Sequence, residues 1–377
     1  MTETLVVNPD TKFIRDVLGE GGEDLKKCYQ CATCSSVCAL SSEEIPFPRK
    51  QMIQAQWGLK DRLLGDPAIW LCHNCGDCTV RCPRDVKPGA VMGALRAQAI
   101  KNYAFPRFMG TLTSQPRYLP LLLAVPVLIF GAIAAWGPRD ATGELEFASV
   151  FADPVLEGLF WVVALLAIIV YVVGIARMVR ALRSAGHDGK ILPALIPAAV
   201  EIVSHKRFAE CGAEKSRYWG HLLTLFGFLG LFVVGAVVGM GALSGLIHPP
   251  LSIFNPLKLL ANISTLVIAA GLIVMLVERM GSREDRGPNT YFDWFFLLVL
   301  AGIVLTGMLS EILRLGESTT LMYPVYFVHL VLIFCLFIYG PYSKFSHFIY
   351  RTIAMAATWD RRAQTVTKVM TTKEAFA

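Results

Sequence analysis

The chain has 377 residues, of which 54% are hydrophobic and 17% are charged, and its formal net charge is +6. Soluble domains carry more charge and fewer apolar residues, so this composition excludes an ordinary soluble protein and indicates a membrane protein. The modest positive charge lies mainly on loops beside apolar segments. That distribution is typical of membrane topology, and we expect no nucleic-acid binding.

The first 110 residues are polar and contain most of the cysteines: eight of the ten lie between Cys28 and Cys82. No apolar stretch of the signal-peptide kind is evident here, so we expect this part of the chain in the cytoplasm. In that reducing compartment, dense cysteines indicate metal ligation rather than disulfides. Helical stretches separate the cysteine runs, and no segment alternates like a strand.

The eight cysteines form two runs with the spacing C-x2-C-x2-C-x3-C, which is the pattern of bacterial two-cluster ferredoxins. Three closely spaced thiolates hold one cluster, and the fourth cysteine of a run reaches the other cluster. We therefore predict two [4Fe-4S] clusters, the first held by Cys28, Cys31, Cys34 and Cys82, and the second by Cys72, Cys75, Cys78 and Cys38. Two zinc sites are the alternative, although zinc motifs usually place two C-x2-C pairs across a longer gap.

Six apolar segments follow, each near the length of about 20 residues that a membrane helix needs. They cover residues 119–136, 155–176, 220–246, 256–277, 291–313 and 322–341. A shorter apolar stretch, 191–203, contains two prolines and is expected at the membrane interface. We predict an all-α fold, with a helical two-cluster ferredoxin-like domain over 1–110, a membrane cytochrome b domain of about six spans over 111–350, and a cytoplasmic tail over 351–377.

The charges of the loops predict the orientation of these spans. Basic residues crowd the loops between spans two and three, after span four and after span six, whereas the alternate loops are poor in them. Loops rich in Lys and Arg stay on the cytoplasmic side. We therefore expect a multi-pass protein of the cytoplasmic membrane with both termini in the cytoplasm.

His221, His329 and His347 lie in or beside the predicted spans. Histidine is costly in lipid, and neutral imidazole is a common axial ligand of haem iron. His221 and His347 each lie about 25 residues from the outer end of their spans, or about 37 Å at the helical rise of about 1.5 Å per residue. This shared depth predicts a haem b between them. A helix–helix hydrogen bond is the alternative for each histidine.

His329 precedes His347 by eighteen residues, about 27 Å along a continuous helix, which leaves room for a second haem. No histidine lies at the matching depth of the third span. His248, just beyond the outer end of that span, is the partner that we consider for His329, and a single haem is the alternative. We expect His187 and His205 to be solvated or to contact another part of the protein.

The segments 327–332 and 341–347 resemble the last helix of the cytochrome b (gamma) subunit of respiratory nitrate reductase, whose two haem histidines have this same spacing. The segment from His221 to Gly230 resembles the helix of that family that begins with a haem histidine. The family has a second histidine ten residues later, where this chain has Leu231. The cysteine domain resembles the C subunit of heterodisulfide reductase, and the membrane part is similar to the E subunit of that enzyme.

A fusion of these two parts resembles the QmoC family, the membrane subunits of the quinone-interacting membrane-bound oxidoreductase complex. The resemblance implies electron transfer between menaquinone, haem b, the clusters, and flavin-containing QmoA-like and QmoB-like subunits, with adenylylsulfate reductase of sulfate respiration as a further partner. Such a chain relays electrons and has no bond-making residues of its own. The alternatives are a related disulfide or sulfite-pathway complex, such as the Dsr membrane complex, and a membrane redox sensor or transporter.

Overall fold

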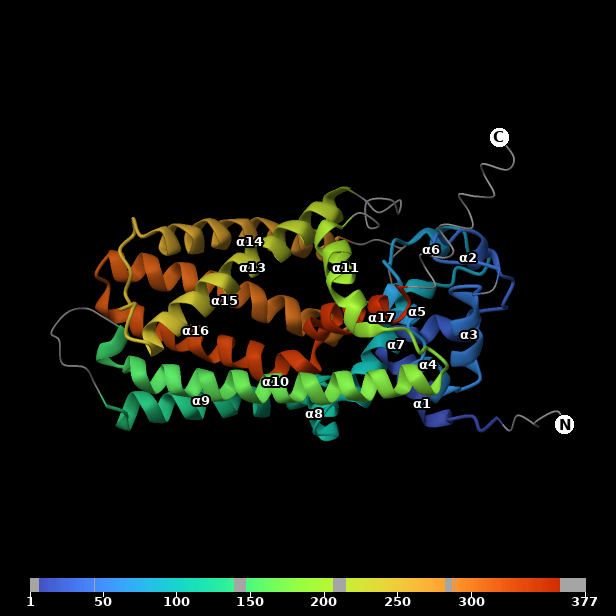
Figure 1. The fold of residues 1–377 in the computed structure, drawn as a ribbon, viewed down its shortest axis with the longest axis horizontal. Helices are drawn as coiled ribbons and strands as arrows, with labels where there is room; N and C mark the ends of the chain where they lie inside the picture. The colour runs from blue at the N-terminus through green and yellow to red at the C-terminus, as the bar shows by residue number, and fades with distance from the viewer. Residues whose placement is uncertain are drawn as a thin grey trace.

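A computed structural model describes residues 7–43, 45–138, 147–205, 215–281, 287 and 289–359. This part of the chain is helical and contains no strand, which confirms the predicted all-α fold. Long helices form a bundle at one end of the elongated molecule, and short helices gather at the other end (Figure 1). Several of the charged loop positions that predict the orientation, and most of the predicted tail, lie outside the described residues: 139–146, 206–214, 282–286 and 360–377.

The short helices build the part that carries the two cysteine runs. They are α1 (Thr11–Val17), η1 (Leu18–Gly22), η2 (Glu23–Lys27), α2 (Thr33–Ser36), α3 (Arg49–Gln56), α4 (Lys60–Leu64), α5 (Ala68–Leu71), α6 (Asp77–Val80), α7 (Pro88–Tyr103) and α8 (Arg107–Thr113). Helix α7 starts at a proline, whose fixed φ suits the first helical turn. Its buried side chains pack beside Trp70 and Met52 and form the centre of the core.

Six helices are long and apolar enough to cross a membrane, which confirms the predicted number of spans. They are α9 (Leu119–Trp136) with the preceding turn η3 (Pro116–Tyr118), α10 (Asp153–Ser184), α13 (Lys215–Leu243), α14 (Pro256–Met280), α15 (Tyr291–Leu315) and α16 (Thr319–Tyr339). The apolar helix α11 (Ile191–Ser204) is shorter. Large apolar side chains such as Leu128, 71% exposed, line the outside of the bundle, as expected for helices that face lipid.

Helix α10 belongs to both parts of the molecule. It has 32 residues, or about 48 Å at the helical rise, which exceeds the thickness of a bilayer core. Its last turns carry Met178 and Leu182 into the core of the cysteine-rich part, where both are fully buried. Arg177 donates to the backbone oxygen of Tyr103 at 3.3 Å, at the end of α7. The two parts therefore share a core and a continuous helix.

The last membrane helix does not continue to His347. Helix α16 ends at Tyr339, two single turns follow as η5 (Gly340–Tyr342) and η6 (Lys344–Ser346), and His347 begins a separate helix, α17 (His347–Ala357). Ser346 stabilises the break, because its hydroxyl donates to the backbone oxygen of Pro341 at 2.6 Å. The rise along one continuous helix therefore does not give the separation of His329 and His347, contrary to our assumption from the sequence. Helix α17 packs against α5 and α11 instead.

Candidate metal centres

The two cysteine runs share an unusual backbone conformation. In the first run Gln30 and Ala32 have positive φ angles of 60° and 70°, and Asn74 and Gly76 have 52° and 92° at the matching positions of the second run. A short helix, α2 or α6, starts directly after the second of these positions. Alternation of this kind turns successive backbone N–H groups toward one point and forms a concavity for an anion. Both runs therefore have a backbone conformation that suits a negatively charged group.

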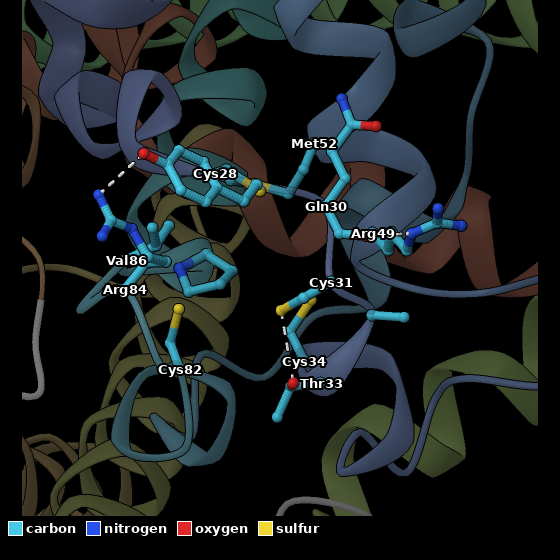
Figure 2. Close-up of a pocket in the computed structure, with 13 residues that line it drawn as sticks. Cys28, Gln30, Cys31, Thr33, Cys34, Arg49, Met52, Cys82, Arg84 and Val86 are labelled. Atoms are coloured by element: carbon cyan, nitrogen blue, oxygen red, sulfur yellow. Dashed lines mark hydrogen bonds between the residues drawn. The ribbon is translucent and has the colours of Figure 1, made fainter.

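Cys28, Cys31, Cys34 and Cys82, predicted to hold the first cluster, line one pocket together (Figure 2). Cys82 comes from the second run and faces the other three across the cavity. At the rim, the guanidinium of Arg84 lies 4.2 Å from the ring centroid of Tyr29, whose side chain is 70% exposed. This group of thiols is therefore open to solvent on one side, where Cys31 is also exposed.

The other four cysteines also lie near one another. The pKa of the Cys38 thiol is raised to about 11, chiefly by burial and in smaller part by the nearby Cys72 and Cys75. Burial likewise raises the pKa of Cys78, with contributions from Cys72, Cys75 and Cys38. The backbone N–H of Asn74 donates to Cys72 Sγ at 3.4 Å. Crowded, buried thiols ionise readily only beside positive charge, which iron ions would supply, so the residues of both groups suit cubane clusters.

His221, near the start of α13, is hydrogen-bonded to His205. We expected His205 to be solvated or to contact another part of the protein. His205, which ends α11, is 7% exposed and places Nε2 at 2.9 Å from His221 Nδ1. The other nitrogen of His205, Nδ1, lies 3.1 Å from the backbone oxygen of Val203, which can only accept. Burial lowers the pKa of His205, so its ring is neutral and Nε2 carries the lone pair. His221 therefore donates from Nδ1, and its own Nε2 holds the lone pair, as an imidazole that ligates a metal would require.

His347 lies near His221 in a cationic environment. Burial lowers the pKa of His347 well below its ordinary value, and the charges of Arg96, Arg351 and Lys344 contribute in the same direction. The ring centroid of Trp70 lies 6.1 Å from that of His347, and Trp70 Nε1 is buried without a hydrogen-bond partner among the described residues. Two neutral imidazoles, several cations and an unsatisfied indole donor suit a haem whose propionates are acidic.

His329 is bonded to the neighbouring helix. Its Nδ1 lies 3.0 Å from Thr306 Oγ1 on α15, and the Thr306 hydroxyl donates to the backbone oxygen of Gly302 at 2.6 Å. This is the helix–helix hydrogen bond that we set out as the alternative to haem ligation. His248 is exposed in the loop after α13. No hydrogen bond or ring contact joins it to His329 within the described ranges.

Three residues at these sites could not be recognised from their sequence context. His205 is separated from His221 by sixteen positions and lies outside the predicted spans. Trp70 reaches His347, and Arg351 reaches the Cys72 loop, only because α5 packs against α17. The one sequence feature that could have pointed to Trp70 is its position two residues before Cys72. A tryptophan in such a position is also typical of an ordinary core residue.

Comparisons with known proteins are most informative for the cysteine-rich part. The 4Fe-4S dicluster domain family matches residues 24–86, which supports two [4Fe-4S] clusters and disfavours the zinc alternative. Over 95 residues the chain is 40% identical to the C subunit of the H(2):CoB-CoM heterodisulfide,ferredoxin reductase of Methanothermobacter thermautotrophicus. It is also 40% identical over 95 residues to a protein of Archaeoglobus profundus that is described as like the C subunit of heterodisulfide reductase. Each match covers 25% of this chain, and the chain spans about half the length of these curated relatives.

One relative covers both parts of the molecule. Citrate utilization protein B of Escherichia coli is 26% identical over 382 aligned positions, which include 94% of each chain. No solved structure matches the chain. Together with the six apolar helices, these findings support an iron–sulfur membrane protein whose cysteine-rich part is similar to subunits of oxidoreductases.

Proposed function

We propose that this chain is the membrane subunit of a quinone-dependent respiratory complex and relays electrons between menaquinone, one haem b, two [4Fe-4S] clusters and soluble flavin-containing subunits. The observation that carries the proposal is the packing of α17, which begins with His347, directly against α5, which leads into Cys72. In this proposal residues 1–110 hold the clusters, 111–350 form the cytochrome b part and 351–377 are a cytoplasmic tail. The protein lies in the cytoplasmic membrane with both termini in the cytoplasm.

The two groups of thiols described above are the proposed cluster ligands, with one cysteine exchanged between the two runs. Exchange of the fourth ligand ties the runs together, so each loop depends on the other for its shape. The first cluster is held by Cys28, Cys31, Cys34 and Cys82, and the second by Cys72, Cys75, Cys78 and Cys38. The repeated positive φ angles, which direct backbone N–H groups at both sites, support this assignment.

His221 and His347 are the proposed haem ligands. A bound haem supplies a one-electron carrier at the end of the bundle nearest the clusters. His205 holds His221 in the tautomer that presents Nε2, and Trp70 offers an indole donor beside His347. His329 is proposed to bond helix α16 to α15, so that one haem is bound, and a second haem between His329 and His248 is the alternative.

The resemblance described from the sequence suggests one setting for the relay, and the relatives suggest two more. Resemblance to the QmoC family favours QmoA-like and QmoB-like partners and adenylylsulfate reductase. The names of the heterodisulfide reductase relatives favour a related disulfide reductase complex. The match to citrate utilization protein B, which covers nearly the whole chain, favours a complex that serves citrate utilization. Purification of the tagged chain from its native membrane, followed by identification of the bound subunits, distinguishes these settings.

An absorption spectrum and an iron analysis of the anaerobically purified full chain test the proposal. We expect a b-type haem band that is lost in His221→Ala and in His347→Ala, with the iron–sulfur content retained. His187→Ala is the matched control and retains the band. A preparation that holds the clusters but shows no haem band in any variant contradicts the cytochrome b function, and a colourless, iron-free preparation contradicts the relay altogether.

A further inference from the structure

Helix α17 carries a predicted haem ligand and an arginine on the same face. His347 and Arg351 are four residues apart, which places their side chains one above the other along the helix. Arg351 donates from one nitrogen to the backbone oxygens of Trp70 at 3.0 Å and Cys72 at 3.4 Å, and its other nitrogen lies 3.2 Å from His73 Nδ1. A single helical turn therefore joins the haem site to the loop that begins with Cys72.

Two further arginines reach the same loop from other helices. Arg96 on α7 donates to the backbone oxygen of Cys72 at 3.1 Å, and Arg217 on α13 donates to that of Asn74 at 2.5 Å. In the first cysteine run, the matching oxygen of Gln30 accepts from Arg49 at 2.9 Å. The loop of the second run is thus surrounded by three guanidinium groups, of which Arg217 and Arg351 come from helices that follow the cysteine domain.

Trp70 lies between the histidine site and this loop. Its side chain is completely buried, its ring centroid is 6.1 Å from that of His347, and it precedes Cys72 by only two residues. The path from His347 to Cys72 therefore crosses one ring contact and a short length of backbone. The first thiol group instead opens to solvent beside the exposed Tyr29.

We propose that the cluster held by Cys38, Cys72, Cys75 and Cys78 is the carrier next to the membrane, and that Arg351 positions it and raises its reduction potential. This inference rests on the ligands proposed above. Reduction adds one electron to the cluster, and fixed positive charge stabilises the more negative state. In this order an electron from a bound haem would reach this cluster first, then the solvent-facing cluster and finally the soluble subunits, without any change in bonding.

One acidic residue opposes the arginines. Asp77 Oδ2 lies 3.3 Å from Cys75 Sγ, so its carboxylate disfavours reduction of the same cluster. Substitutions of Arg351 and Asp77 should therefore move the same midpoint potential in opposite directions. Arg49, which lines the pocket of the other group, provides the matched control, because its removal should lower the other midpoint.

The experiment is an EPR-monitored redox titration of the full chain in detergent, which measures the midpoint potential of each of the two clusters. We expect Arg351→Gln to weaken reduction of one cluster three- to tenfold, about 30 to 60 mV for a one-electron couple. Asp77→Asn should raise that same midpoint, Arg49→Gln should lower the other, and Arg351→Lys, which retains the charge, should restore most of the potential.

Two results would overturn the inference: Arg351→Gln and Arg49→Gln lower the same midpoint, or Arg351→Gln lowers neither. If Arg351→Gln loses iron through misfolding, Arg96→Gln, which removes another guanidinium from the backbone oxygen of Cys72, carries the same comparison and should lower the same midpoint that Asp77→Asn raises. Cluster midpoints do not require haem, so this titration also succeeds if no haem is bound. Absence of the haem band would therefore contradict the proposed cytochrome function, whereas the titration alone tests the effect of the arginine.

Discussion

Removal of the acceptor on His205 should weaken haem binding at His221. The chain of bonds from His221 Nδ1 to His205 Nε2, and from His205 Nδ1 to the oxygen of Val203, assigns the tautomer of both rings. In His205→Leu the N–H of His221 loses this acceptor in a buried setting. The ring then turns or moves its proton to Nε2, and both changes remove the lone pair from the metal position.

The magnitude follows from the burial of the pair. An N–H left without an acceptor in a buried setting costs about 1–3 kcal/mol. Loss of a hydrogen-bonded partner of a metal-ligating histidine typically costs about 10- to 100-fold in affinity, which corresponds to about 1.4–2.8 kcal/mol. His205 is 7% exposed, so water cannot easily replace it, and we expect the upper half of this range for His205→Leu.

Transfer of haem from the purified protein to excess apomyoglobin measures this effect. His205→Leu should release haem faster or bind it more weakly by about 30- to 100-fold. His205→Gln retains an acceptor oxygen and should lie near the native protein, while His187→Leu is a control for histidine removal elsewhere. Equal haem retention in the Leu and native proteins would refute the tautomer assignment, and equal loss in Leu and Gln would show that packing, not the acceptor, matters.

Three other measurements follow from the sites. Cys78→Ala should remove one of the two clusters and lower the iron–sulfur iron from about eight to about four atoms per chain, measured by chemical iron analysis; retention of eight would contradict its ligand role. Gly307→Ala should lower the unfolding free energy by about 1–3 kcal/mol, because the added Cβ would lie 2.9 Å from His329 Cε1, whereas Gly235→Ala meets nothing within 4 Å and should be neutral in thermal unfolding. His248→Ala should leave the pyridine haemochrome content unchanged, and loss of a haem equivalent would establish a second haem.

The sequence was informative where the determinant is local. Cysteine spacing within about ten residues predicts which three thiols of a run can surround one cluster, and the ferredoxin pattern predicts that the fourth comes from the other run. The length and apolarity of the spans likewise follow from the thickness of the bilayer. Tertiary packing decided the remainder: His205 meets His221, sixteen positions away, and Arg351 reaches the Cys72 loop. No periodicity encodes those contacts, because each joins segments that are distant along the chain.

Because α10 extends from the membrane bundle into the cysteine-rich part, the two parts cannot be separated without opening a shared core. Because Met178, Leu182 and Tyr350 complete the core around Trp70, a fragment that stops near residue 110 would expose a large apolar surface to water. The isolated fragment should therefore aggregate or require a substitute surface, even though the relatives from heterodisulfide reductases are separate polypeptides. A shared core would also hold the proposed electron carriers at one spacing while the bilayer around them fluctuates.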